Sequence, residues 1–204
     1  MLTIDTMLDI PEDLARCVAF HGHICPGLVY GYLVAKEAMK LMNLERATDE
    51  EIVAICDNDS CAVDALQVLL GTSTGKGNLI IRDFGKNAYT VLSRSGRKSY
   101  RFVRKVRYEY QGKEKSTFDR LDAAIAKGMA SEGDRRYMKL LKVEDLLGRY
   151  FDEIFTTTEI PFDEPLYAPL ERSEPCAMCG EMTMASKMVV VNDGRVCIPC
   201  SQKS

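Results

Sequence analysis

The sequence predicts an α+β protein, with a mixed helix and sheet core domain followed by a small C-terminal zinc-finger domain with four cysteines. Two observations predict this class. Before residue 160, helical and strand periodicities follow one another in the order helix, strand, helix, strands, helices. After that point, an acidic stretch with four prolines leads into two Cys-x-x-Cys pairs. The prolines indicate an extended connector, and the cysteines indicate a module held together by a metal.

The first expected element is an amphipathic helix that begins at Pro26, a residue suited to a first helical turn. A short strand, 52–56, should follow and run into a polar turn. Ser60 or Asp59 can then cap a second helix over about 61–70. The first helix is predicted by apolar residues that step by four, three, four and three: Leu28, Tyr32, Ala35, Met39 and Met42.

The middle of the chain predicts a hairpin flanked by helices. Residues 88–93 and 100–110 alternate well enough for strands, and residues 94–97 form the turn between them. A helical period then returns at Phe118 and extends to Ile154. A local hairpin beside several helices favours α+β over a parallel sheet.

The acidic, proline-rich residues 161–173 form the predicted linker. Proline fixes φ and removes a backbone donor, so this segment should be extended. Residues 1–160 are then the core domain, and residues 174–204 are the zinc finger. About thirty residues cannot stabilise an apolar core of their own without a metal or a disulfide.

The composition is that of a globular protein. Of 204 residues, 46% are apolar and 28% charged, and 27 Lys and Arg oppose 30 Asp and Glu for a net charge of −3. This balance excludes a mainly disordered chain and gives no overall sign of a nucleic-acid partner. No apolar run approaches the ~18 residues of a membrane span, and the N-terminus lacks the features of a signal peptide. We therefore expect a cytoplasmic protein with no membrane partner.

The small domain carries the spacing Cys-x2-Cys-x17-Cys-x2-Cys. Each pair presents two sulfurs from one turn, and the loop between the pairs lets them complete a tetrahedral shell, for which zinc is the expected ion. Four thiolates leave no position for water or substrate, so we expect a structural site, with a redox dithiol as the alternative. The expected ligands are Cys176, Cys179, Cys197 and Cys200.

A second group of reactive side chains lies in residues 20–27, FHGHICPG. In an extended or looped backbone, His21, His23 and Cys25 alternate and can face one way. Cys25 would lie at a helix N-terminus, which favours its thiolate, and Cys61 could approach it from the start of the second helix. One or two of these histidines and one or two of these cysteines, with a water, would make an incomplete transition-metal shell, with zinc as the expected second metal. The alternative is that the histidines bond to backbone and Cys25 is a buried small residue.

Three strings together resemble the FmdE family, named for a component of molybdenum or tungsten formylmethanofuran dehydrogenase. They are FHGHICPGLVYGY, DSCAVDALQVLLGTSTGKGNLIIRDFGKNAY and the terminal CAMCG…CIPC. The resemblance covers most of residues 14–155 and the tail. It implies an α+β core with an auxiliary treble-clef-like zinc finger, usually in a homodimer. Only 201–204 follow the last cysteine, so a C-terminal helix should be very short.

The resemblance also implies a pocket. The metal would be held by His21, His23, Cys25 and Cys61, and the polar neighbours for a substrate would be Lys76, Asn78, Asp83 and Lys86. We expect Cys25 and Cys61 to be catalytic with Lys76 or Asp59, which would handle charge or protons beside a Lewis-acidic metal. The chain would be an enzyme or an accessory subunit of a larger complex, in one-carbon metabolism related to methanogenesis. The reaction and the small-molecule substrate stay open.

The basic hairpin 94–107 supports the alternative function. It holds seven basic residues and no acidic one, with Tyr100 and Phe102 between them. Such a strand could neutralise phosphates while its aromatic rings stack on bases, although a solvated basic face is a simpler interpretation. The alternative is therefore a non-enzymatic module that binds nucleic acid or a protein complex through the zinc finger and this hairpin.

Overall fold

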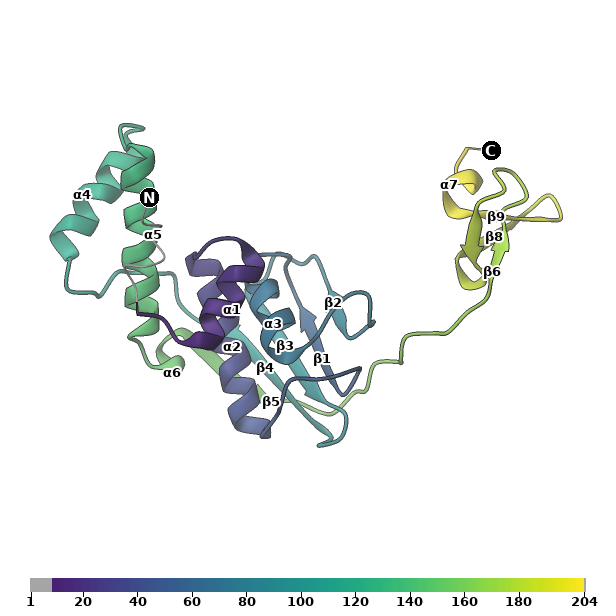
Figure 1. Cartoon of the computed structure of the whole chain (residues 1–204), viewed down its shortest axis with the longest axis horizontal. Helices are drawn as coiled ribbons and strands as arrows, with labels where there is room; N and C mark the ends of the chain where they lie inside the picture. The colour runs from purple at the N-terminus through teal and green to yellow at the C-terminus, as the bar shows by residue number, and fades with distance from the viewer. Residues whose placement is uncertain (1–8, 204) are drawn as a thin grey trace. The chain divides into compact units, whose positions relative to one another are not determined.

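The computed structural model describes residues 9–203. The chain divides between Tyr167 and Ala168 into two compact units, which we call the main unit and the C-terminal module. Both are drawn in Figure 1, and their mixture of helices and strands confirms the predicted α+β class. Within the described residues, no helix is both long and apolar enough to cross a membrane.

A five-stranded sheet is the frame of the main unit. Its order is β2-β1-β3-β4-β5, with β1 and β2 parallel and the remaining neighbours antiparallel. Side chains alternate between the two faces of a strand, and Ala54, Tyr89, Val91 and Phe102 lie in the large apolar core under the helices. The strands are β1 (Ile52–Cys56), β2 (Leu79–Ile81), β3 (Ala88–Ser93), β4 (Lys98–Arg104) and β5 (Phe155–Glu159).

Helices α1, α2 and α3 cover one face of this sheet (Figure 1). Helices α2 and α3 meet at Gly31, where an added Cβ would lie 2.0 Å from the carbonyl oxygen of Ala62. Only glycine allows the two backbones to come so close. This contact sets the N-terminal turns of both helices side by side. The bounds are α1 (Glu12–His21), α2 (Pro26–Met42) and α3 (Ala62–Leu70).

The other face of the sheet is partly covered by the start of the predicted linker. Phe162 packs in a small apolar cluster with Leu92. Arg94 has a side chain only 6% exposed and donates to Glu164 Oε1 at 2.7 Å. The beginning of the proline-rich segment therefore lies against the main unit, and the division into compact units falls later, after Tyr167.

A helical hairpin of α4 and α5 has its own apolar cluster. The rings of Tyr110 and Phe118 stack with centroids 4.4 Å apart. Helix α5 begins with a capping box in which Ser131 and Asp134 bond each other's backbone N–H groups. The bounds are α4 (Lys115–Ala126), α5 (Glu132–Leu147) and α6 (Phe151–Ile154).

The hairpin of strands β3 and β4 and the helix α2 follow the prediction more closely than the segments around them. The strand expected over 100–110 ends at Arg104, because Tyr110 leaves the sheet for the apolar cluster of α4 and α5. The helical period that runs to Ile154 is interrupted at Gly148, which ends α5 before the short α6. Strand β5 and helix α1 were not predicted.

The predicted cap of α3 was wrong. Cys61 occupies the N-cap position and makes no side-chain cap bond. Ser60 Oγ instead donates to Asn58 Oδ1 at 2.7 Å, within the polar turn after β1. Asp59 is exposed at the same turn. The turn is thus held by its own side chains, and the helix begins on a cysteine.

The C-terminal module consists of two two-stranded sheets and short helical turns (Figure 1). Asn192 and Asp193 have φ of 47° and 65°, as the tight hairpin turn between β8 and β9 requires. Helix α7 has four residues and agrees with the very short helix expected there. The elements are β6 (Ser173–Pro175), β7 (Met182–Met184), η2 (Ala185–Lys187), β8 (Met188–Val191), β9 (Gly194–Cys197) and α7 (Ile198–Ser201).

Candidate metal centres

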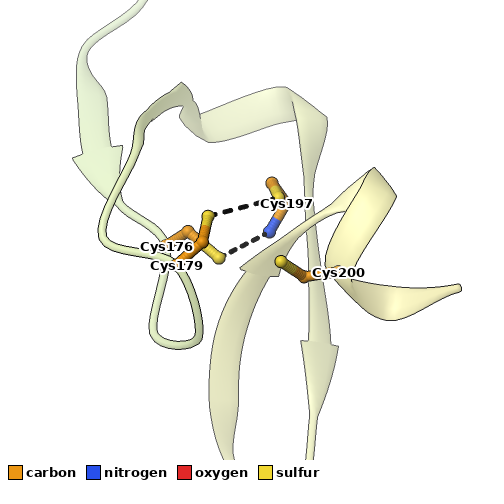
Figure 2. Close-up of side chains that lie close together, drawn as sticks. All are labelled: Cys176, Cys179, Cys197 and Cys200. Carbon is orange, nitrogen blue, oxygen red and sulfur yellow. Dashed lines mark hydrogen bonds between the residues drawn. The ribbon is translucent and has the colours of Figure 1, made fainter. Parts of the chain in front are cut away.

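Four cysteine sulfurs converge in the C-terminal module, and we call them the four-cysteine site. The sulfurs of Cys176, Cys179, Cys197 and Cys200 all lie within 4.8 Å of one another. Figure 2 shows the four side chains directed toward a common centre, with 3.9 Å between the sulfurs of Cys179 and Cys197. A tetrahedral shell with Zn–S bonds of about 2.3 Å has edges of about 3.8 Å, so this spacing fits one zinc ion.

The local backbone of the four-cysteine site favours the thiolate of one cysteine, Cys176. Gly180 takes a φ of 75° after the first cysteine pair, which lets the chain turn back sharply. Hydrogen bonds from the backbone N–H groups of Cys179 and Cys197 lower the pKa of the Cys176 thiol to about 6. Contact with the Cys197 side chain raises the pKa of Cys200 to about 12. A divalent cation at the centre would relieve this crowding of negative charge.

A second group of donors lies in the main unit, and we call it the His-Cys centre. The ligating atoms of His21, Cys25 and Cys61 lie within 4.8 Å of one another. His21 Nε2 is 3.8 Å from Cys25 Sγ, again the edge length of a tetrahedral shell. The three residues are the last of α1, the N-cap of α2 and the N-cap of α3. Two segments separated by more than thirty residues thus supply one set of donors.

Local chemistry at each helix end explains this convergence. Gly22, with a φ of 88°, ends α1 so that His21 remains on the last helical turn. Cys25 caps α2, and its Sγ accepts from the Leu28 N–H at 3.4 Å. At Gly27, an added Cβ would lie 3.1 Å from Cys61 Cβ. The absence of a side chain at Gly27 therefore leaves room for the two cysteines to face each other.

Asp64 orients the imidazole of the His-Cys centre. Its Oδ2 lies 2.7 Å from His21 Nδ1, and Gln67 Nε2 donates to the other carboxylate oxygen at 3.1 Å. A carboxylate on Nδ1 fixes the tautomer that leaves Nε2 as the metal donor, which is the usual support of a metal-bound histidine. Sequence reasoning missed this role. The signal was present, because an acidic residue one helical turn after Cys61 lies on the same face of α3.

Burial also tunes the second cysteine. Desolvation, followed by the negative charge of Cys25, raises the pKa of the Cys61 thiol. Two thiolates side by side are therefore unfavourable without a cation between them. Two sulfurs and one imidazole are donors that suit zinc and related transition metals, so the residues fit a metal centre with three protein ligands.

The structure does not place both histidines in the same way. The ring of His23 lies 4.5 Å from that of His21, but His23 is exposed and is not within the 4.8 Å group. A left-handed turn at Gly22 replaces the expected extended backbone, and the two rings contact each other although only His21 joins the donor group. His23 instead borders a cavity of about 360 Å³ beside three basic residues of α5: Arg135, Arg136 and Lys139.

A different cavity of about 360 Å³ opens at the His-Cys centre itself. His21 and Cys61 line it, together with Asp59 and Asp64. Apolar residues, including Leu79, also line it. The structure thus brings Asp59 to the cavity beside the centre.

The other predicted substrate contacts lie elsewhere. Lys76 Nζ donates to the carbonyls of Thr48 and Asp49, at 3.2 Å each. Asn78 is fully buried and donates to the Ile52 carbonyl at 2.9 Å. Both side chains hold the glycine-rich residues 71–78 against the start of β1 and the segment before it. Neither is among the residues that line the cavity at the His-Cys centre.

Asp83 and Lys86 lie in the exposed loop between β2 and β3. They too are absent from the lining of the cavity at the His-Cys centre, and Lys86 borders a separate basic hollow. Lys76 and Asn78 precede β2 and Asp83 and Lys86 follow it, so their positions depend on the paths of two loops and not on a spacing in the sequence.

Known proteins resemble this chain in fold or in sequence. A structure of an FmdE-like protein of the tungsten formylmethanofuran dehydrogenase type, from Syntrophus aciditrophicus, covers 95% of this chain and 92% of its own, with a TM-score of 0.57 and 21% identity. That likeness is one of fold. A probable S-adenosyl-L-methionine-binding protein of Archaeoglobus fulgidus is 29% identical over 92% of this chain, which spans only 52% of that relative.

The family comparison covers the region that holds the His-Cys centre. The model of FmdE, described as molybdenum formylmethanofuran dehydrogenase operon, matches residues 20–159. The match begins one residue before His21 and extends through the last strand of the sheet. The chain therefore belongs to the FmdE family.

Proposed function

We propose that this protein is a metalloprotein whose His-Cys centre holds one zinc ion through His21, Cys25 and Cys61 and keeps a coordination position for an exogenous ligand. The observation that carries the proposal is the convergence of three donor atoms within 4.8 Å, backed by the carboxylate of Asp64. Three protein ligands are the number that catalytic zinc sites use, whereas structural sites use four.

The chain's own residues divide the work at this centre. Cys25 and Cys61 supply negative charge, His21 supplies a neutral donor, and Asp64 keeps the imidazole in place. Asp59 lines the adjoining cavity and is exposed, so it is suited to accept or return a proton of a bound molecule. The metal, when bound, would supply Lewis acidity. Lys76 and Asn78 are left out of this site because they bind backbone elsewhere.

Family membership supports a place in one-carbon chemistry. The family's description names a formylmethanofuran dehydrogenase operon, so we propose an enzyme or accessory subunit that works in the cytoplasm with a larger complex. We also propose a homodimer and a purely structural zinc ion in the four-cysteine site. In this scheme residues 161–173 connect a core domain to a zinc finger that contributes no chemistry of its own.

Metal analysis of the purified protein tests the proposal. Wild type should contain two equivalents of zinc per chain, and His21→Ala combined with Cys25→Ala should contain one. Cys17→Ala removes a buried thiol outside both centres and should keep two equivalents. In cobalt-loaded protein, added cyanide should change the absorption of wild type but leave the double variant unchanged. One equivalent in wild type, unaltered by the double substitution, contradicts the proposal.

A second candidate function is binding of S-adenosylmethionine. The relative from Archaeoglobus fulgidus is described as a probable binding protein for that molecule. The cavity at the His-Cys centre carries Asp59 and Asp64 and no Lys or Arg among its lining residues, which suits a ligand with a positive sulfonium and an ammonium group. Calorimetry with S-adenosylmethionine should show binding that weakens in Asp59→Asn and persists in Asp122→Asn, a change on exposed α4. Absence of heat with wild type removes this candidate.

A further inference from the structure

A hollow of about 600 Å³ at the end of β4 is lined by an unusual number of basic side chains. We call it the basic hollow. Its volume falls in the range of small-molecule sites. No acidic residue is among those that line it, although the chain as a whole carries a net charge of −3. Its cations are Lys86, Arg101, Arg104, Lys105 and Arg107.

Most of this positive charge is not neutralised within the protein. Among the described residues, Lys86, Lys105 and Arg107 form no ion pair. Arg104 lies over the ring of Tyr30 at 5.1 Å, a contact that holds the guanidinium without cancelling its charge. Four cations that repel one another around one hollow favour an anion at its centre.

One wall of the hollow is rigid. Arg101 binds Asp57 Oδ2 at 2.6 Å, and the Asp57 side chain is only 4% exposed. The same guanidinium contacts Thr90 Oγ1 at 3.4 Å, on the neighbouring strand. Two exposed apolar residues, Val103 and Val106, also line the hollow and could contact an uncharged part of a ligand.

The aromatic residues of this region are engaged elsewhere. Phe102 is fully buried in the core, and Tyr110 belongs to the cluster under α4. Tyr108 donates to Asp145 at 2.7 Å, and Tyr100 donates to Glu159 at 3.0 Å. Sequence-independent binding of single strands needs aromatic faces on which successive bases stack. The rings of the hairpin are thus engaged, and Phe84, exposed on the loop before β3, is a single ring and not a row of stacking faces.

We propose that the basic hollow binds the phosphate group of a small phosphorylated molecule. The cations gather around one hollow instead of following a track along the surface, as a polynucleotide would need. A dianionic phosphate offers several acceptor oxygens to the four unneutralised cations, and the valines suit the organic part. This site is independent of the two metal centres, so it stands or falls separately from the proposed function.

Adenosine monophosphate and adenosine serve as a matched pair of probes, because they differ only by the phosphate. Calorimetry on the full, metal-loaded chain at low salt should show binding of the nucleotide and none of the nucleoside. Lys105→Glu combined with Arg107→Glu should weaken nucleotide binding at least about tenfold, since two attractions become repulsions. Lys86→Glu, on a separate loop, should weaken it in the same direction.

Arg120→Glu combined with Lys127→Glu is the control, because it makes the same change of net charge on exposed α4 and should leave nucleotide affinity unchanged. Equal binding of adenosine and its monophosphate, or no binding of either, overturns the proposal. So does a twelve-nucleotide oligothymidylate that binds more than tenfold tighter than adenosine monophosphate and no longer binds when Lys105→Glu and Arg107→Glu are combined, because the occupant would then be a nucleic acid.

Discussion

The two candidate metal centres of this protein are built from similar side chains in opposite ways. The four-cysteine site takes all its donors from one short module, and within each of its two pairs two residues separate the cysteines. The His-Cys centre takes its donors from three helix ends, and the glycines at 27 and 31 let those ends meet. One centre is complete with four sulfurs, whereas the other has three protein donors and a cavity beside it.

This difference teaches what each centre is suited for. The module has only a small apolar cluster, so an ion bound by all four sulfurs would supply much of its stability. The main unit has a large apolar core as a source of stability, so an ion at its centre could keep a coordination position open. Closing the shell serves stability, and leaving it open serves binding.

Loss of a ligand from the four-cysteine site should have the largest effect. Cys197→Ala should unfold the C-terminal module, because structural zinc contributes about 10–16 kcal/mol in small finger peptides. Amide signals of 173–201 in a 1H–15N spectrum should collapse to random-coil positions, while the melting temperature of the main unit stays the same. Met178→Ala, an exposed change between two ligands, is the control. A module that stays folded without Cys197 would erase the contrast between the centres.

Adding a side chain where α2 and α3 cross should have the second largest effect. In Gly31→Ala the new Cβ would lie 2.0 Å from a backbone oxygen of α3, so we expect a loss of about 3 kcal/mol or more in urea unfolding of the main unit. Gly27→Ala meets Cys61 Cβ at 3.1 Å and should cost less stability but release the metal of the His-Cys centre. Gly133→Ala, in α5 with its nearest contact at 3.7 Å, is the control and should be neutral or stabilising.

Removal of the carboxylate that bonds to His21 should affect the zinc affinity of one centre and not that of the other. Asp64→Asn should lower zinc affinity at the His-Cys centre by about 10–100-fold, the usual effect of losing a supporting carboxylate. The four-cysteine site should keep its affinity. Competition with a chromophoric chelator measures both affinities in one titration. Equal affinities in wild type and variant would mean that His21 does not ligate the ion.

The two cysteines outside both centres should give the smallest effect. Burial raises the pKa of Cys17 to about 11 and that of Cys56 to about 12, from 9.0 for an exposed thiol. A raised pKa means that the folded state retains the proton, so this contribution is complete below pH 9 and is lost between pH 9 and 12. Urea midpoints should fall over that interval less steeply in Cys56→Ala than in wild type, and parallel curves would contradict the assignment.

Several elements were predictable because their cause is local. Strand β3 begins and ends where the alternation of apolar residues does, and helix α2 begins at Pro26. The segment after β4 was harder to predict, since Tyr110 packs on Phe118 in the cluster of α4 and α5 and not in the sheet. The cap of α3 failed for a similar reason: Ser60 has a stronger partner in Asn58 than in the helix.

The resemblance to the family rests on motifs in the sequence, and the α+β class and the four cysteines of the module follow from short-range periodicity and spacing. Which polar residues meet depends on how the helices and loops pack. In the structure His21, Cys25 and Cys61 lie together, and Asp64 bonds to His21. His23 borders another cavity, and Lys76 and Asn78 bond to the backbone of a neighbouring segment. The two cysteines come together because the backbones of α2 and α3 touch at a glycine. A contact between distant segments cannot be predicted from the periodicity of either segment alone.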